Sequence, residues 1–184
     1  MAIYDNIEDI ERAELYRLFG FLFFNEPSTE IIMQLQEMFQ MEFSDSIQEI
    51  RDDFKDLFLY PNGKLMPYES LYVYPLNESS HLWGKSSAEV IDFYNLAGLS
   101  IDEEFELPPD HISVELIFMS YLIENGLINL QKRFIEEHLS RWIPKFCDKL
   151  QTYSKTAFFK EIANILRDFV LFEADEFNIN IKGD

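Results

Sequence analysis

The chain has a single cysteine, Cys147, and no long apolar run. A lone cysteine excludes a disulfide within the chain and suits a reducing compartment. The start of the sequence lacks the basic residues followed by an apolar stretch that mark a secretory signal. The longest apolar runs, at 18–24 and 116–123, fall far short of the ~20 residues that a membrane-spanning helix needs. We therefore expect a cytoplasmic protein that does not insert into a membrane.

Basic residues are also scarce. The 184 residues include 15 Lys and Arg against 34 Asp and Glu, which gives a net charge of −19. A field of this sign repels phosphate backbones and anionic lipids, so we expect neither nucleic acid nor a membrane surface as a partner. The same field would attract a basic peptide. A second interpretation stays open, in which the charge only keeps the protein in solution.

The sequence also lacks a set of metal ligands with a recognisable spacing. His81, His111 and His138 lie far apart along the chain. Only residues 78–81 read Glu-x-x-His, whereas a di-metal helical bundle needs two such turns. No glycine-rich loop precedes a predicted helix, so a phosphate-bearing cofactor is not indicated. The sequence therefore predicts neither a metal nor a cofactor.

Evidence for a catalytic centre is equally thin. Ser70 and His111 could meet in the fold, with Asp110 or Glu115 orienting the histidine, as in a small helical hydrolase. However, no Gly-x-Ser-x-Gly turn supports this arrangement. Cys147 falls on the apolar side of a predicted helix, which favours an inert buried thiol. We do not expect an enzyme, although the hydrolase stays open as an alternative.

Apolar residues recur at helical spacing along most of the chain, and no alternating strand pattern is present. Ser46 and Ser86 each begin a Ser-x-x-Glu capping box, and Gly98 and Gly126 are expected just after helix ends, Gly98 in the left-handed conformation. The fold class is therefore predicted to be all-α. The expected helices lie at 7–24, about 29–40, 46–60, 86–98, 110–125, 127–153 with a bend or break around Pro144, and about 155–174.

Residues 61–85 break the helical pattern with prolines, glycines and aromatic residues. So long an irregular stretch is usually functional or disordered, and its aromatic content argues against disorder. We expect one domain over residues 1–184, with an N-terminal helical group at about 1–98, an acidic connector at 99–109 and a C-terminal group at about 110–178. Because a long connector permits exchange of halves between copies, a monomer and a domain-swapped homodimer both stay open.

Residues 107–116 read Leu-Pro-Pro-Asp-His-Ile-Ser-Val-Glu-Leu and contain the most unusual motif. Asp110 is predicted to cap the helix that follows. His111 and Glu115 are four residues apart and so share a face. A helix N-terminus disfavours a cation, so His111 is expected to be neutral, able both to donate and to accept a hydrogen bond. His111 either grips a peptide or is a core histidine bonded to Glu115 or to the 61–85 loop.

Aromatic side chains are concentrated in the 61–85 loop. Tyr68, Tyr72, Tyr74 and Trp83 either attach the loop to the helices or form an apolar wall for a ligand. Glu69, between them in sequence, could face a guanidinium group. Trp142 lies outside this loop and is predicted to be a core residue.

Three segments together resemble one known family. They are residues 107–116, the Pro-Tyr-Glu-Ser-Leu-Tyr segment at 67–72 with its flanks, and residues 134–147. In order and spacing they are similar to the TorD/DmsD/NarJ family of cytoplasmic chaperones, which mature molybdenum-containing redox enzymes. The resemblance covers roughly residues 10–172. It implies that the Asp110–His111 pair lines a peptide-binding region, and it favours Tyr68, Ser70 and Tyr72 for ligand contact.

The resemblance implies a chaperone that binds the twin-arginine-type signal peptide of a molybdopterin oxidoreductase subunit and assists its maturation and cofactor insertion before export. Such a peptide has a basic front and an apolar core, so it needs carboxylates beside an apolar groove. The alternative is an acidic helical adaptor for another basic or amphipathic peptide. The predicted peptide-binding residues are Tyr68, Glu69, Ser70, Tyr72, Trp83, Asp110, His111 and Glu115.

Overall fold

The computed structural model describes residues 7–59, 63–73, 83–102 and 107–179, and these residues form an all-α fold. No strand occurs among them; one isolated antiparallel bridge joins Tyr68 to His111. The predicted fold class is confirmed. The helices are α1 (Asp9–Phe24), α2 (Thr29–Met38), α3 (Ile47–Phe58), α4 (Ser70–Val73), α5 (Lys85–Leu96), α6 (Ile112–Glu124), α7 (Ile128–Phe134), the π-helix η1 (Ile135–Leu139), α8 (Ser140–Tyr153) and α9 (Ala157–Glu176).

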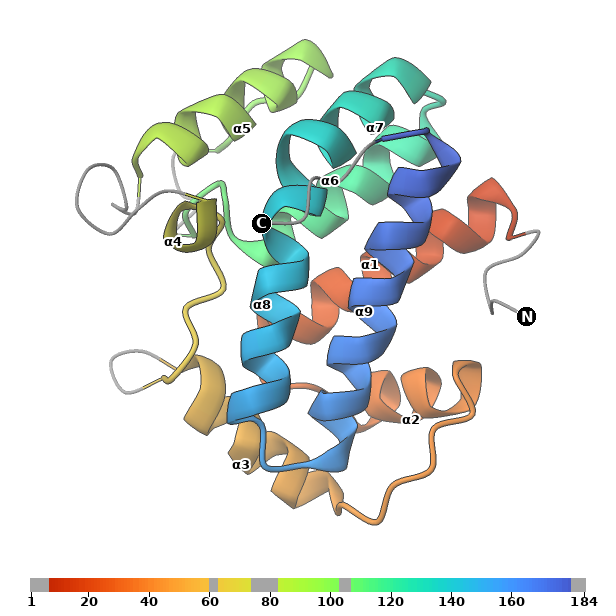
Figure 1. Cartoon of the computed structure of the whole chain (residues 1–184), viewed down its shortest axis with the longest axis vertical. Coiled ribbons are helices and arrows are strands. Elements are labelled where there is room, and N and C mark those ends of the chain that lie inside the picture. Colours follow the sequence, from red (N-terminus) through yellow and green to blue (C-terminus); the bar gives the residue numbers. More distant parts are fainter. Residues whose placement is uncertain (1–6, 60–62, 74–82, 103–106, 180–184) are drawn as a thin grey trace.

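Helices α8 and α9 form an antiparallel hairpin, and α2 and α3 lie at the end where the two are joined (Figure 1). Asp53 of α3 fixes this end, because its carboxylate accepts hydrogen bonds from the backbone N–H of Thr156 at 2.8 Å and from the Thr156 hydroxyl at 2.7 Å. Helix α1 packs against α6. Gly20 allows this close approach, since a Cβ there would lie 2.6 Å from Cγ1 of Ile117.

Aromatic rings fill much of the core between these helices. Phe23 of α1 meets Phe58 of α3 at a centroid distance of 5.7 Å and Phe146 of α8 at 5.6 Å, both edge-on. Tyr16 of α1 lies 4.7 Å from Phe169 of α9. Offset and edge-on pairs of this kind add stabilisation beyond their buried area. In the described part of the chain, no helix combines the length and the apolar composition needed to cross a bilayer.

Several helix ends follow the local sequence signals. The Ser46 hydroxyl accepts a hydrogen bond from the backbone N–H of Glu49, and the Glu49 carboxylate accepts one from the backbone N–H of Ser46, which confirms this capping box. Gly98 and Gly126 have φ of +81° and +62°, so both take the left-handed conformation just after a helix. Glycine adopts this conformation without the penalty that a Cβ imposes.

Three local predictions are wrong. Ser86 does not begin a capping box: α5 starts at Lys85 without a side-chain cap, and Ser86 is buried in its first turn. Asp110 does not cap α6, because His111 occupies the N-cap position. The expected interruption around Pro144 lies before that residue, in the π-turn at 135–139, and α8 continues through Pro144. In the first two cases Asp110 accepts tertiary hydrogen bonds from Ser70 and Ser87, and in the third His138 of the π-turn lies against Glu69.

Candidate functional site

Asp110 joins three helices in the interior. Its Oδ2 accepts a hydrogen bond from the backbone N–H of Ser70 at 3.0 Å, which anchors the start of α4. Its Oδ1 accepts from the Ser87 hydroxyl at 2.7 Å, which anchors the first turn of α5. Its carbonyl oxygen accepts from the backbone N–H of Glu69 at 3.0 Å. Asp110 is fully buried, so it links the irregular 63–73 segment and α5 to the start of α6.

Backbone pairing extends this junction on both sides. Ile112 donates its N–H to the carbonyl of Pro67 at 2.9 Å, and the Tyr94 hydroxyl donates to the carbonyl of Pro109 at 2.8 Å. Tyr68 is paired with His111, and their rings meet edge-on at a centroid distance of 5.1 Å. The prolines suit this arrangement, because they offer carbonyl acceptors and have no N–H to satisfy. Residues 67–70 are thereby held against the N-terminus of α6.

His111 caps α6 with its ring. Its Nδ1 lies 3.2 Å from the backbone N–H of Ser113 and accepts its hydrogen bond. Burial lowers the pKa of His111 to about 4, although the nearby carboxylate of Asp110 acts in the opposite direction. The expected neutral imidazole is therefore confirmed, but its main cause is burial. The interpretation of His111 as a core histidine packed on the 61–85 loop describes this geometry.

Two buried glutamates extend from the junction towards α8 and η1. The Glu115 Oε2 accepts a hydrogen bond from the indole Nε1 of Trp142 at 2.9 Å, and Oε2 of Glu69 lies 2.8 Å from Nδ1 of His138. Oε1 of Glu115 is also buried and has no hydrogen-bond partner among the described residues. Burial raises the pKa of Glu69, against the opposing effect of His138. Burial likewise raises the pKa of Glu115, and the neighbouring Glu69 adds to the rise.

Burial therefore favours the protonated form of both carboxyl groups. Trp142 is buried beside Glu115 and is the core residue that the sequence predicts. His138 reaches Glu69 from the π-turn, where one extra residue per turn rotates the side chains relative to an α-helix. The part played by His138 is not visible in the sequence, because its partner lies 69 residues away.

The eight predicted peptide-binding residues thus divide by exposure. Five are buried in the junction, and two aromatic rings are half-buried beside it. Trp83 is 57% exposed and has φ of +65°, a conformation that residues with a side chain rarely adopt. The buried five are Glu69, Ser70, Asp110, His111 and Glu115, and the half-buried two are Tyr68 and Tyr72.

The loop aromatics have different surroundings. Tyr72 packs on Trp142 at a centroid distance of 5.5 Å and on Phe146 at 5.9 Å, and Nζ of Lys149 lies 4.6 Å from its ring centre. Tyr72 therefore attaches α4 to α8. Trp83, by contrast, presents its indole to solvent directly before α5. Tyr74 lies outside the described residues.

The geometry does not assemble a hydrolase. The Ser70 hydroxyl is buried and makes no hydrogen bond in the described structure, and His111 uses Nδ1 to cap its own helix. Asp110 accepts from the backbone of Ser70 and does not orient the histidine. The Cys147 thiol is buried, and burial raises its pKa, as expected for an inert thiol.

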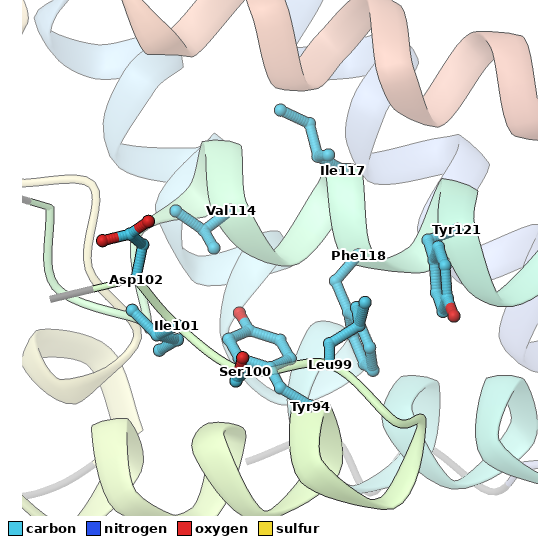
Figure 2. A pocket seen from close by; sticks show the side chains of 9 residues that line it. All are labelled: Tyr94, Leu99, Ser100, Ile101, Asp102, Val114, Ile117, Phe118 and Tyr121. Atoms are coloured by element: carbon cyan, nitrogen blue, oxygen red, sulfur yellow. The ribbon is translucent and has the colours of Figure 1, made fainter. Parts of the chain in front are cut away.

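An apolar pocket of about 310 Å³ lies on the other side of Tyr94, between α5, residues 99–102 and α6 (Figure 2). Val114 and Phe118 project from α6 towards Leu99 and Tyr94. Sequence reasoning missed this pocket. The available signal was the spacing of residues 114, 117, 118 and 121, which gives α6 a second apolar face, but such a stripe is usually core.

Comparison with known proteins identifies relatives of this chain. Residues 23–148 match the family model of the nitrate reductase delta subunit. The chaperone protein TorD of a Psychrobacter strain is 30% identical, covering 86% of this chain and 88% of that protein. TorD of Vibrio parahaemolyticus is 30% identical over 139 residues, which cover 68% of this chain and 63% of the relative. The chain thus spans less than two thirds of that relative.

A solved structure agrees in fold. A candidate redox enzyme maturation protein from Archaeoglobus fulgidus is 25% identical, with a TM-score of 0.57, and the match covers 86% of this chain and 93% of that protein. The family model and the Psychrobacter relative each extend over most of the chain. The chain therefore belongs to the family of nitrate reductase delta subunits and TorD-type redox-enzyme maturation chaperones, a family of chaperones and not of catalysts.

Proposed function

We propose that this protein is a cytoplasmic chaperone that binds the twin-arginine-type signal peptide of a molybdopterin oxidoreductase subunit. It assists maturation of that subunit and insertion of its cofactor before export. Family membership supports the chaperone role. The net charge of −19 supports a basic partner, because long-range attraction concentrates cations at the surface.

The observation that carries the proposal is the conformation of Trp83. Its indole is 57% exposed, and its backbone has φ of +65°, which costs free energy for a residue with a side chain. Strain of this kind persists at functional sites when the surroundings fix it. Here α5 follows directly and is anchored through Ser87 to Asp110. The junction thus holds an exposed aromatic ring in a defined place.

In this proposal the eight residues act in two ways. Tyr68, Tyr72 and Trp83 offer aromatic surface to the peptide, and the edge of His111 lies beside Tyr68. The buried Glu69, Ser70, Asp110 and Glu115 hold the irregular segment in position, so they act on binding through structure. The exposed carboxylates elsewhere on the chain supply the attraction for arginine.

Calorimetric titration with a synthetic peptide tests the proposal. The probe carries two adjacent arginines followed by a short apolar segment. We expect binding that weakens, yet persists, as salt shortens the Debye length from ~10 Å at 0.1 M to ~3 Å at 1 M. Trp83→Ala should weaken binding by about tenfold, as expected for loss of an aromatic anchor worth roughly 1–2 kcal/mol.

A matched control is Tyr153→Ala, which removes an aromatic ring that is 47% exposed at the end of α8, away from the junction. We expect this variant to bind like the parent. If the parent shows no affinity for the probe at low salt, peptide binding is wrong. Equal losses in the two variants would remove Trp83 from the site while leaving peptide binding in place.

The acidic adaptor differs from this proposal in its partner. Co-purification followed by mass spectrometry distinguishes them, because the proposal requires a molybdopterin oxidoreductase subunit among the bound proteins. Light scattering on the purified protein measures whether it is a monomer or a domain-swapped homodimer, which stays a prediction. So do the single-domain boundaries and the cytoplasmic location.

A further inference from the structure

The pocket beside α6 has walls from three separate segments. Tyr94 comes from α5, Leu99 and Ile101 from the residues that follow it, and Val114 and Phe118 from α6 (Figure 2). Its volume of about 310 Å³ lies at the low end of the ~300–1,000 Å³ that is typical of ligand sites. A pocket of this size holds a few apolar side chains. It is too small for a large cofactor.

Polar groups in this pocket are largely committed to the protein itself. The Tyr94 hydroxyl donates to the carbonyl of Pro109 at 2.8 Å, and the Tyr121 hydroxyl donates to the carbonyl of Ala97 at 3.4 Å. Both rings therefore present carbon to the pocket. Hydrogen bonds from a ligand are consequently not the main source of affinity, and the site favours apolar groups.

The charge at the pocket has one sign. Among the described residues that line it, Asp102 carries the only formal charge, and it is exposed at the edge. No lysine or arginine lines this pocket within the described chain, so a phosphate or carboxylate ligand finds no counter-charge. An apolar group with a neighbouring cation has the complementary chemistry.

A second pocket, of about 220 Å³, gives a useful contrast. It lies on the opposite side of α5 and is lined by Arg133, Arg141 and His138 together with Glu89 and Asp92. Mixed charges of this kind disfavour an apolar side chain, because their hydration would be lost on binding. Of the two pockets, only the one beside α6 suits the apolar part of a peptide.

Position also links the pocket to the junction. Tyr94 forms one wall of the pocket and bonds Pro109, the residue before Asp110. Val114 follows His111 by one turn of α6. The wall is therefore held by the same contacts that fix the irregular segment, so the pocket is preorganised.

We propose that this pocket binds the apolar side chains that follow the arginine pair of the client peptide, with an arginine next to Asp102. The inference rests on the proposed function and adds the place where the apolar segment is bound. It separates two contacts: aromatic surface around Trp83, and an open apolar pocket beyond Tyr94. Specificity for an apolar segment then comes from the pocket, and the cation sets its orientation.

The test compares two probe peptides and two isoleucine variants by calorimetry. One peptide carries two arginines followed by phenylalanine and leucine, and the other has serine in place of these two apolar residues. Ile101→Ser removes part of the pocket wall outside any helix. Ile128→Ser is the matched control, since Ile128 is 62% exposed on α7 and does not line the pocket.

We expect the parent to bind the apolar peptide at least tenfold more tightly than the serine peptide. Ile101→Ser should weaken binding of the apolar peptide about tenfold, as expected for loss of a buried aliphatic contact, and leave the serine peptide unchanged. Ile128→Ser should bind both like the parent. If Ile101→Ser binds the apolar peptide as the parent does, the pocket assignment is overturned while peptide binding stands. If the parent binds neither peptide, the proposed function fails as well.

Photo-cross-linking gives a reading that does not depend on a variant. The probe carries benzoylphenylalanine in place of its phenylalanine, and mass spectrometry locates the cross-link on the unmodified protein. We expect attachment within residues 99–102 or 114–121. Attachment confined to Tyr68, Tyr72 or Trp83 would overturn the pocket assignment, because it would place the apolar segment at the loop instead.

Discussion

The two faces of α6 have opposite chemistry and opposite access to solvent. One face directs Glu115 towards Trp142 of α8 and is sealed, although it carries a carboxyl group. The other presents Val114 and Phe118 to a pocket that is open, although its walls are apolar. Polarity therefore does not tell which face of this helix is open to solvent.

This difference has a physical basis. Residues 67–70 are irregular, and their backbone groups need partners away from water. Asp110 supplies two of those partners with its side chain and carbonyl, and Ile112 supplies a third by donating its N–H to the carbonyl of Pro67. The polar groups on this side of α6 thus make hydrogen bonds that hold residues 67–70 in place. The side chains of the apolar face do not hold this segment, and residues 99–102 cover them only in part.

The largest effect is expected when the sealed face loses its central acceptor. Asp110→Ala leaves the buried Ser70 N–H and the Ser87 hydroxyl without their partner. Each lost partner costs roughly 1–3 kcal/mol, so the free energy of unfolding should fall by about 3 kcal/mol in urea denaturation. Asp110→Asn keeps one acceptor oxygen and should lose less.

An exposed aspartate of α5 provides the control. Asp92→Ala removes an exposed carboxylate, so its stability should stay within about 0.5 kcal/mol of the parent. A similar loss in Asp92→Ala and Asp110→Ala would show that the two aspartates have equivalent surroundings, and the sealed junction around Asp110 would be wrong.

Next in size is the contact between α1 and α6. A Cβ at Gly20 would lie 2.6 Å from Cγ1 of Ile117 and 3.2 Å from the carbonyl oxygen of Ser113. Overpacking of this kind costs ~1–3 kcal/mol, so Gly20→Ala should lower the free energy of unfolding by about 2 kcal/mol. Ile117→Ala should lower stability by itself but reduce the additional cost of Gly20→Ala. Additive losses in the double variant would contradict a clash at Ile117.

The pH dependence of stability tests the carboxyl pair of the sealed face. Burial raises the pKa of Glu115 and of Glu69 in the folded protein, so the folded state holds more protons than the unfolded state above ~4.3. Stability contributed by these protons is complete below that value and is lost as pH rises towards the raised folded pKa. The ionisable groups near the pair are Asp110, His138, Tyr94 and Arg141.

Glu115→Gln removes one member of the pair and keeps an acceptor for Trp142. The urea midpoint of the variant, measured relative to that of the parent, should therefore be higher at pH 8 than at pH 5. The matched control is Glu136→Gln, an exposed residue of η1, which should follow the parent at both values. If Glu115→Gln also follows the parent, the interior pair does not hold an extra proton.

Much of the fold is encoded locally. Helical spacing gave the order of the long helices, and Ser46, Gly98 and Gly126 marked ends that the structure confirms. The short α4 and the π-turn at 135–139 were not predicted. Each depends on partners distant in sequence, such as Asp110 for α4, and local propensity carries no record of such contacts.

The candidate site was predictable in composition but not in exposure. The motif around Asp110 and His111 left two interpretations open, and one of them, a core histidine against the 61–85 loop, describes the geometry. A cap, a ligand and a buried hub use the same residue types, so the sequence could not separate them. Val114 and Phe118 line an open pocket, but their spacing is that of an ordinary core helix. The sequence therefore did not mark them as candidate site residues.

The smallest effect concerns the exposed ring before α5. Trp83 has φ of +65°, which costs ~1–2 kcal/mol for any residue with a Cβ, and Trp83→Ala retains that cost. Trp83→Gly removes it but loses ~0.4–1 kcal/mol through the greater freedom of the unfolded chain. The free energy of unfolding of the glycine variant should therefore equal that of the alanine variant or exceed it by up to about 1 kcal/mol in urea denaturation.

Ala88→Gly is the control, at an exposed position inside α5. It should lower the free energy of unfolding by about 1 kcal/mol, because glycine is normally less stable than alanine inside a helix. Both Trp83 variants should bind the arginine peptide equally weakly, because both lack the indole. If Trp83→Gly is instead less stable than Trp83→Ala by the amount seen at Ala88, the backbone there is unstrained, and the strongest indication of function at Trp83 disappears.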